Sequence, residues 1–377
     1  MKILMLNYEY PPLGGGASPV TKSLAEELVK LGHSVDVVTM GFKGLKQKEE
    51  INGVTVYRVP SIRKQRNVCQ THEMLSYCYS AYRFLPELLK ENKYDICHTH
   101  FIIPTGVVSY LNKSKIPYII TSHGSDVPNY NPDRFGMQHR LLKPIWKEIV
   151  RNAACITSPT QFLRDLILEN FGEENYCNTI KVIPNGINPK NFTPKKKENK
   201  ILVVTRLFER KGVQYVIDAM KGVNDYRLVI CGDGPYKKNL AERIKRSGSD
   251  NIELLGYVNN ERLKYEYETS SIFIFSSSAE NFPVVLLEAM VSGCAIITTN
   301  VTGCPEVVGD AAILIEPKSS ESIRNALVEL INDNELIIKL GLNARKRAEY
   351  NFYWEKIALS YSKVYETVSR SNHHEIC

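Results

Sequence analysis

Residues 279–290 read Ala-Glu-Asn-Phe-Pro-Val-Val-Leu-Leu-Glu-Ala-Met, and the interpretation of the chain begins there. This stretch follows the apolar run Ile272–Phe275 and three serines at 276–278, a pattern typical of a buried strand that ends in a polar turn. Pro283 suits the first turn of a helix, because the N–H that proline lacks would have no partner there. We therefore predict a strand, a loop and then a helix over Val284–Val291.

Two carboxylates stand eight positions apart in this stretch, Glu280 in the loop and Glu288 in the predicted helix. Open parallel sheets bind ligands at the carboxyl ends of their strands, and the free N–H groups at the start of a helix favour phosphate. Both carboxylates can therefore face one ligand. For either residue alone, a solvated glutamate is the simpler explanation. The pair, with Pro283 and Gly293 around it, favours a functional site.

The length of the chain, 377 residues, suits two domains. Its composition, 43% hydrophobic and 24% charged, is that of a soluble globular protein. The sequence contains no run of about 18 apolar residues, so we predict no membrane span. Met1–Asn7 does not resemble a signal peptide. Nine scattered cysteines without a C-x-x-C pair favour reduced thiols in a cytoplasmic protein and disfavour a zinc site. The formal charge of +7 is compatible with anionic ligands or an anionic surface.

The first half opens with a Rossmann-like unit: the strand Lys2–Leu6, a loop with glycines at 14–16, a helix over Val20–Leu31 and the strand Val35–Thr39. The three glycines let backbone N–H groups approach a ligand. The loop does not match the dinucleotide fingerprint, because Pro19 stands where Gly or Ala is needed and no acid ends the second strand. A nicotinamide dehydrogenase is therefore disfavoured.

Strands and helices continue to alternate, and the pattern restarts after a polar, lysine-rich segment at 192–200. The further elements predicted for the first half are Val54–Val59, Met74–Lys90, Ile96–His100, Tyr118–Ser122, Arg134–Lys147, Cys155–Ser158 and Gln161–Asn170. Those predicted for the second half, besides the stretch above, are Ile201–Thr205, Val213–Met220, Tyr226–Cys231, Asn239–Lys245, Ile252–Leu255 and Ala295–Thr298. We predict an α/β fold with two Rossmann-like domains, residues 1–190 and 191–354.

Three histidines lie on or near predicted strands. His98 and His100 are most simply explained as hydrogen-bonding core residues. His123 follows the strand Tyr118–Ser122 directly and precedes Gly124, so we favour a role in a site.

The hypothesis of a membrane contact rests on basic residues of the first half. Arg134–Lys147 mixes basic and apolar residues, and packing of an apolar face is favoured over a basic amphipathic surface on anionic lipid. Four more basic residues add to this character: Arg58, Arg63, Lys64 and Arg66. No recognisable module groups the basic residues, so nucleic acid is not expected as a partner.

In the second half, Arg206 ends the strand Ile201–Thr205, and Lys211-Gly212 follows five residues later. The guanidinium fork and the lysine charge suit a diphosphate, although a solvated basic turn is the alternative. Carboxylates suit the hydroxyls of a ribose or a sugar, so the combination describes a nucleotide sugar. No DxD or other clear acidic metal motif appears in the predicted crevice. No metal or other cofactor is therefore expected, and Arg206 and Lys211 would neutralise the leaving diphosphate.

The chain resembles the retaining glycosyltransferases of family 4, which have the GT-B architecture of two facing Rossmann-like domains with a central cleft. The segment from Glu280 to Glu288 is similar to the E-x7-E motif of that family. Further similar motifs occur in the same order over nearly the whole chain: Gly14–Gly16, His123-Gly124, Pro184-Asn185-Gly186, Arg206 with Lys211-Gly212, Gly232-x-Gly234-Pro235 and Gly256-Tyr-Val258.

The resemblance implies roles for individual residues. Glu288 would hold the ribose, Arg206 and Lys211 the diphosphate, and Glu280 the hydroxyls of the transferred sugar near its anomeric carbon. The remaining implied contacts are the backbone of Asn281, Phe282 and Pro283 along the sugar and phosphate, Val258 and Gly234 in the donor site, Gly15 and Gly16 over the diphosphate, and His123 on the sugar and acceptor side. The last helix, about 355–377, would pack back on the first domain.

The implied reaction is the transfer, with retained anomeric configuration, of a sugar from a UDP- or GDP-sugar to a hydroxyl of a glycan or lipid-linked acceptor. Polysaccharide or glycolipid biosynthesis is the expected setting, in the cytoplasm or peripherally on the inner face of the plasma membrane. Many family members carry Gly where this chain has Asn281 and Pro283. This difference changes the backbone around the donor sugar, so the resemblance does not identify the sugar that is transferred. The alternatives are a catalytically silent nucleotide-sugar-binding subunit, a sugar-nucleotide epimerase and a two-carboxylate glycoside hydrolase.

Overall fold

The computed structural model describes residues 1–377 except 67, 131, 173–178 and 375–377. The chain forms two compact units, one made of Met1–Asn185 with Trp354–Cys377 and the other of Gly186–Tyr353. Near the points where the chain passes from one unit to the other, the Ile187 N–H donates to the Phe352 carbonyl at 2.7 Å. The two connecting segments therefore run side by side.

The first unit contains an eight-stranded sheet in the order β3-β4-β2-β1-β5-β6-β7-β8. Its strands are β1 (Lys2–Leu6), β2 (Ser34–Met40), β3 (Lys48–Ile51), β4 (Val54–Val59), β5 (Ile96–His100), β6 (Tyr118–Thr121), β7 (Cys155–Ser158) and β8 (Thr179–Val182). All neighbours are parallel except β3 and β4. The sequence did not predict β3, because its Lys-Glu-Glu-Ile has neither an apolar run nor a clear alternation.

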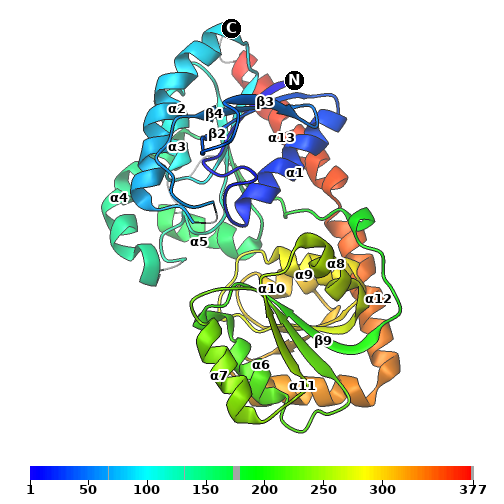
Figure 1. Ribbon diagram of the computed structural model, residues 1–377. Coiled ribbons are helices and arrows are strands. Elements are labelled where there is room, and N and C mark those ends of the chain that lie inside the picture. The colour runs from blue at the N-terminus through cyan, green and yellow to red at the C-terminus, as the bar shows by residue number, and fades with distance from the viewer. Residues whose placement is uncertain (67, 131, 173–178, 375–377) are drawn as a thin grey trace. The chain divides into compact units, whose positions relative to one another are not determined.

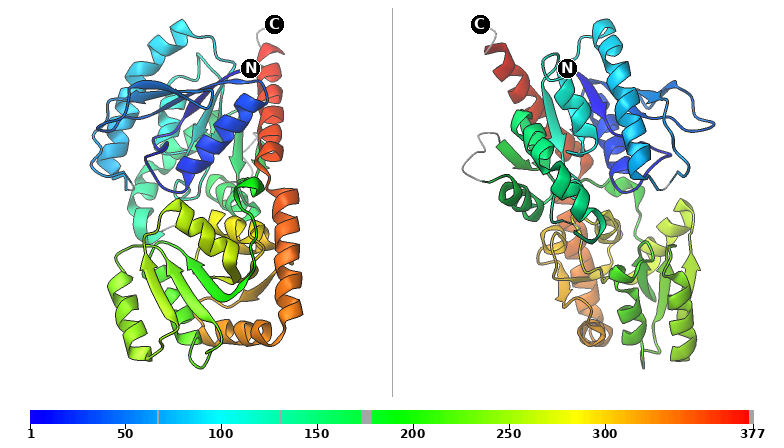
Figure 2. Two further views of the ribbon diagram at one scale, coloured as in Figure 1. Left: turned by 45° about the vertical axis from the view of Figure 1, so that its right-hand side comes forward. Right: turned by 90° about the vertical axis from the view of Figure 1, so that its left-hand side faces the viewer.

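Helices cover both faces of this sheet (Figure 1). They are α1 (Ala17–Lys30), α2 (Thr71–Glu91), α3 (Thr105–Leu111), α4 (Pro132–Asn152), α5 (Gln161–Phe171) and α13 (Trp354–His374). Alternate β1 side chains separate two cores: Leu4 and Leu6 pack with α2–α5, whereas Ile3 and Met5 pack with α1 and α13. The end of the chain is thus part of the core of the first unit, and the left view of Figure 2 shows α13 (red) beside α1 (blue).

The second unit contains a six-stranded, wholly parallel sheet in the order β11-β10-β9-β12-β13-β14. Its strands are β9 (Glu198–Val204), β10 (Arg227–Cys231), β11 (Ile252–Gly256), β12 (Ser270–Phe275), β13 (Ala295–Thr299) and β14 (Ala312–Ile315). This is the doubly wound order, and the direction of winding reverses between β9 and β12. Ligand sites of such sheets lie at the carboxyl ends of the strands on either side of the reversal.

Two sets of helices enclose the second sheet. One face carries α6 (Val213–Ala219), α7 (Lys237–Ser247) and α11 (Ser320–Asn332); the other carries α8 (Asn260–Thr269), α9 (Val284–Val291) and α10 (Cys304–Val308). The helix α12 (Asn334–Asn351) contributes to both cores. The predicted helix Val284–Val291 is confirmed as α9. Pro283 is not in its first turn but immediately before it, with an extended backbone.

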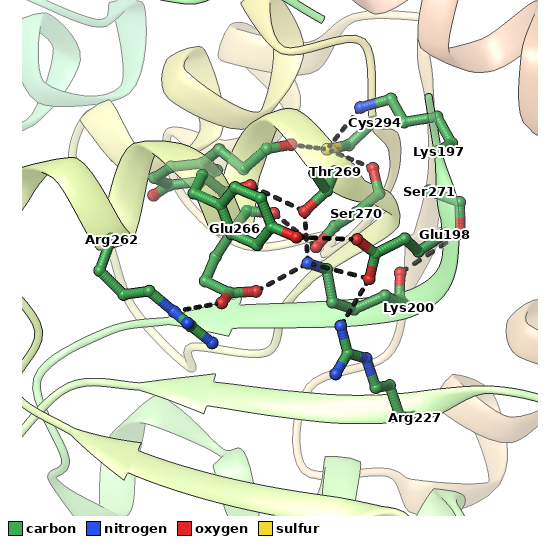
Figure 3. Close-up of polar contacts among 12 residues, drawn as sticks. Lys197, Glu198, Lys200, Arg227, Arg262, Glu266, Thr269, Ser270, Ser271 and Cys294 are labelled. Carbon is green, nitrogen blue, oxygen red and sulfur yellow. Dashed lines mark hydrogen bonds and ion pairs between the residues drawn. The ribbon is translucent and has the colours of Figure 1, made fainter. Parts of the chain in front are cut away.

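A buried charged cluster lies near the amino end of β9 (Figure 3). Lys200 Nζ donates to Glu266 Oε2 at 2.7 Å, and neither side chain is exposed. Arg262 Nε lies 2.6 Å from Glu266 Oε1, which adds a second positive charge. Because Lys200 is at the opposite end of β9 from the ligand edge, we interpret this cluster as structural.

Candidate functional site

The candidate site of the second unit is built on the loops that follow β9 and β12. Gly212, which ends the 3₁₀ helix η3 (Glu209–Lys211), has φ +71°, and a Cβ at this position would overlap the Ser276 carbonyl oxygen. The Ser276 hydroxyl donates to the Lys211 carbonyl at 3.0 Å, and the Ser278 N–H donates to the Arg210 carbonyl at 3.0 Å. Glycine is therefore required for the close approach of the two loops.

Lys211 and Glu280, which the sequence assigns to different parts of a ligand, form an ion pair in the structure. Lys211 Nζ contacts Glu280 Oε1, and the Ser277 hydroxyl donates to the same oxygen at 2.9 Å. The two charged side chains are 10% and 17% exposed. Burial lowers the pKa of Lys211, and the Glu280 carboxylate opposes this change. The pair is thus mostly buried but still accessible.

The loop after β13 holds the backbone of Glu280 in place. The Glu280 N–H donates to Thr302 Oγ1 at 2.9 Å, the Thr302 hydroxyl donates to the Glu280 carbonyl, and the Gly303 N–H reaches that carbonyl at 3.0 Å. Thr302 has φ +45°, an uncommon conformation for a β-branched residue. Sequence reasoning missed Thr302, and the only signal was its place just after a strand of the same sheet.

Glu288 lies on α9, whereas Glu280 lies in the loop before it, and Pro283 stands between them in the sequence. Burial raises the pKa of Glu288 to about 7, and the neighbouring Tyr267 hydroxyl opposes the rise. Of the residues between the two glutamates, Asn281 is buried and the Phe282 ring meets the Phe352 ring edge-on at 5.6 Å. The E-x7-E segment therefore joins a loop and a helix at the carboxyl edge of the sheet, as predicted.

The other donor-site residues predicted in this unit follow β9, β10 and β11. The exposed Arg206 lies over the Phe208 ring, 5.6 Å from its centroid. A Cβ at Gly234 would overlap the Leu207 carbonyl, so the loops after β9 and β10 are closely packed. Val258 follows β11 and packs, half-buried, against the core on the α9 face. All three residues lie on the edge that carries Glu280.

In the first unit, the glycine loop follows β1. The Gly14 N–H donates to the Arg66 carbonyl at 2.7 Å, and the Gly15 N–H donates to Glu9 Oε2 at 2.9 Å. Gly16 caps α1. In this structure protein oxygens thus accept from the N–H groups of Gly14 and Gly15, and the role of Gly15 and Gly16 at the diphosphate stays a prediction from the family resemblance.

His123 lies after β6, in a loop organised by Asp126. The buried Asp126 carboxylate accepts from the backbone N–H groups of Ile102, His123 and Gly124 at 2.8–3.1 Å. His123 Nε2 is 3.0 Å from His100 Nδ1. Burial lowers the pKa of His123 to about 3, so its ring is neutral at pH 7.

His98 is a core residue, as expected. Its Nδ1 is 2.7 Å from the Tyr365 hydroxyl of α13, and its Nε2 is 2.7 Å from Thr121 Oγ1. His100 is also fully buried and stacks on His98, with 4.6 Å between the ring centroids. Both rings therefore belong to the interior of the first unit.

Two of the basic residues predicted to face a membrane are not available for it. The Arg58 and Arg63 side chains are 2% and 0% exposed, because they pair with Glu49 and Glu9 inside the first unit. Lys64 and Arg66 are exposed.

The favoured explanation of α4, packing of its apolar face, is wrong for several of its apolar residues. Met137 and Leu141 are 77% and 74% exposed, and Leu142 and Ile145 are also exposed. The helix packs instead through residues near its end: Trp146, Ile149 and Val150. The side chains of Arg134 and Phe135 lie outside the described residues.

Three features of the described residues bear on other kinds of chemistry. No described helix combines the length and the apolar character needed to cross a membrane. No group of three or more His, Cys, Asp or Glu side chains among these residues is placed to hold a metal ion. The seven described cysteines are free.

Two family descriptions match the chain and together span most of it. Residues 14–191 match Glycosyltransferase Family 4, and residues 186–347 match Glycosyl transferases group 1. The chain belongs to the family 4 glycosyltransferases, and its two Rossmann-like units are those of the GT-B fold.

Individual proteins agree with this assignment. An uncharacterized glycosyltransferase of Methanocaldococcus jannaschii is 29% identical, over 98% of this chain and 99% of its own. N-acetyl-α-D-glucosaminyl L-malate synthase of Bacillus anthracis is 27% identical, over 96% of each chain. The crystal structure of Anabaena HepE in complex with UDP has the same fold, with a TM-score of 0.77, 18% identity and coverage of 97% of this chain and 100% of the other.

The contact between the two loops predicts the effect of a methyl group at Gly212. We expect Gly212→Ala to lower the stability of the second unit by at least about 2 kcal/mol more than Gly248→Ala does, measured as shifts of the urea-unfolding transition. Gly248 is the matched control, because it also ends a helix at φ +67° in the second unit but has open space at its Cβ position. Its substitution costs only the backbone strain, about 1 kcal/mol. Equal losses in the two variants would contradict the assigned contact.

Proposed function

We propose that the protein transfers a sugar from a UDP- or GDP-sugar to a hydroxyl of a glycan or lipid-linked acceptor, with retention of the anomeric configuration and without a metal ion. The observation that carries the proposal is the placement of Arg206, Lys211, Glu280 and Glu288 on the loops and the helix that follow β9 and β12, the strands at the winding reversal. Cations for a diphosphate and carboxylates for hydroxyls are the groups that a nucleotide sugar needs. Binding of UDP by HepE, which shares the fold, is consistent with such a donor.

In this mechanism the protein stabilises charge on the leaving group. Arg206 and Lys211 neutralise the diphosphate as the bond to the sugar breaks, which gives the electrostatic assistance that a metal ion supplies elsewhere. The acceptor hydroxyl attacks on the face that the diphosphate leaves, and its proton passes to the departing phosphate oxygen. Glu280 positions the sugar through its hydroxyls and does not act as a nucleophile. The role of His123 on the acceptor side stays a prediction from the family resemblance.

The donor site is tested by nucleotide binding. We expect one of UDP, GDP or ADP, or its sugar conjugates, to raise the melting temperature, equally with and without EDTA. Arg206→Ala and Lys211→Ala should each weaken diphosphate binding about 10- to 100-fold, the loss expected for a hydrogen bond between charged groups. Glu280→Ala should lose most turnover while nucleotide binding survives.

Arg246→Ala is the matched control for these variants, because it removes an exposed positive charge from α7 of the same unit. Normal turnover of Glu280→Ala would contradict the assignment. Nucleotide binding without turnover in the unsubstituted protein would favour the silent subunit. Isomerised sugar formed from donor alone would favour the epimerase.

Glu288 makes donor binding dependent on pH. Because burial raises its pKa to about 7, the free protein carries the ionised carboxylate above that pH and the neutral acid below it. The ionised form accepts from ribose hydroxyls, so the affinity for UDP-glucose should rise about tenfold between pH 6 and pH 8. The diphosphate of this ligand does not titrate in the same range. Calorimetry on Glu288→Gln should give weaker binding that no longer changes with pH; an unchanged profile would contradict the role of Glu288.

We further propose that α4 rests on an anionic membrane surface, where lipid-linked acceptors are found. Met137 and Leu141 are exposed on this helix together with Arg140 and Lys143. Apolar side chains that enter the interface beside basic ones that meet lipid phosphates are typical of interfacial helices.

Vesicle pelleting tests the membrane contact. Vesicles containing phosphatidylserine should pellet the protein at low salt but not at high salt, and pure phosphatidylcholine vesicles should not pellet it. The double variant Met137→Ser with Leu141→Ser should lose most of this binding. Its matched control is Ile338→Ser with Leu342→Ser, since these α12 residues are 55% and 54% exposed in the other unit. No pelleting at low salt, or equal loss in both double variants, would exclude the proposal.

A further inference from the structure

The ion pair between Lys211 and Glu280 joins two groups whose proposed ligands differ. Lys211 is assigned to the diphosphate and Glu280 to the sugar, yet in the structure each is the partner of the other. A nucleotide that attracts Lys211 must therefore compete with Glu280 for it.

We propose that this competition makes Glu280 a specificity-determining residue, which selects a nucleotide sugar over a free nucleoside diphosphate. The inference rests on the proposed function, because it requires phosphate at Lys211 and sugar hydroxyls at Glu280. The inference goes beyond that function, because it makes the Glu280 carboxylate responsible for distinguishing the nucleotide sugar, which is the substrate, from the free nucleoside diphosphate, which is the product.

The departure of the Lys211 ammonium group from the Glu280 carboxylate costs free energy. Among the described residues, the side-chain partners of its carboxylate are Lys211 and Ser277, and both meet Oε1. When Lys211 turns to a phosphate, the 17%-exposed carboxylate keeps one neutral hydroxyl and gains a negatively charged neighbour. Breaking a mostly buried pair in this way carries a larger penalty than the pair itself contributes to stability.

The backbone around the pair prevents it from separating by a loop movement. Gly212 and Ser276 hold the Lys211 turn against the end of β12, and Thr302 holds the backbone of Glu280 through two hydrogen bonds. The flexible part is the four-carbon stem of Lys211. We therefore expect the ammonium group to move between carboxylate and phosphate while both backbones stay in place.

A sugar on the nucleotide changes the balance. Its hydroxyls donate to the carboxylate that Lys211 has left, so the donor replaces the lost partner and the bare nucleoside diphosphate does not. The complex with product is thus disfavoured relative to the complex with substrate. After transfer of the sugar, Glu280 can recover Lys211 as the nucleotide leaves.

Calorimetric titration of the full chain with UDP and UDP-glucose, and with GDP and GDP-mannose, tests the inference. For the nucleotide that binds, Glu280→Gln should bind the free diphosphate about tenfold more tightly than the unsubstituted protein, while its affinity for the sugar conjugate does not rise. A role of Glu280 in structure alone gives no gain of affinity. The melting temperature of the variant checks that it is folded.

Two further variants test whether the release of Lys211 causes the gain in diphosphate affinity. Glu209→Gln removes an exposed negative charge from the same turn as Lys211 and should change diphosphate affinity less than about twofold. In a Lys211→Met background, Glu280→Gln should give no gain, because there is no ammonium group left to release.

Each alternative result has a definite meaning. Unchanged or weaker diphosphate binding by Glu280→Gln overturns the inference but leaves the proposed function intact. An equal gain in Glu209→Gln also overturns it, since general electrostatics would then be sufficient. An unsubstituted protein that binds none of the four ligands contradicts the proposed function, and the inference falls with it.

Discussion

The contact between the loops after β9 and β12 is the constraint on which the rest of the candidate site depends. The two strands are parallel neighbours, with Ile272 opposite Ile201, so their carboxyl ends meet at one edge. Their helices α6 and α9 then leave toward opposite faces of the sheet. Only at such a reversal do two adjacent loops diverge and leave a ligand room between strand ends. Gly212 permits the remaining close approach, which brings a lysine from one loop to a glutamate from the other.

Two buried Lys–Glu pairs stand near opposite ends of β9 and have different surroundings. Lys200 and Glu266 are fully enclosed, and Arg262 and Glu198 supply further charge around them (Figure 3). Lys211 and Glu280 keep some exposure, and beside them lie the Ser277 hydroxyl, which donates to Glu280, and the Phe275 ring, whose centroid is 5.8 Å from Lys211 Nζ. A Lys–Glu ion pair thus stabilises the fold where all its partners are groups of the protein. The other pair is suited to a ligand, because there a ligand can replace one of the partners.

Much of the fold could be predicted from the sequence because buried parallel strands leave strong apolar runs, as in Ile272–Phe275 and Ile201–Val204. The charged edge strand β3 leaves no such run. The E-x7-E residues and Arg206 could be placed at the carboxyl edge of the sheet, because they directly follow strands that the apolar runs predict. Local patterns could not show that Lys211 pairs with Glu280, that Thr302 supports it, or that Arg63 is buried against Glu9, because each is a contact between distant segments. The exposure of Met137 was equally hidden, since an amphipathic pattern does not say which helix faces find a neighbour.

The packing of α13 in the interior of the first unit affects how the protein folds as it is synthesised. Tyr361 and Tyr365 lie in the same core as Ile3 and Met5, so the first unit is assembled from both ends of the chain. Residues Gly186–Tyr353 are, in topological terms, inserted into it. On the ribosome, the second unit has its whole sequence available before the first unit has its last helix, and the nascent amino-terminal sheet must wait with one apolar face incompletely covered. The order of completion is therefore the reverse of the order of synthesis.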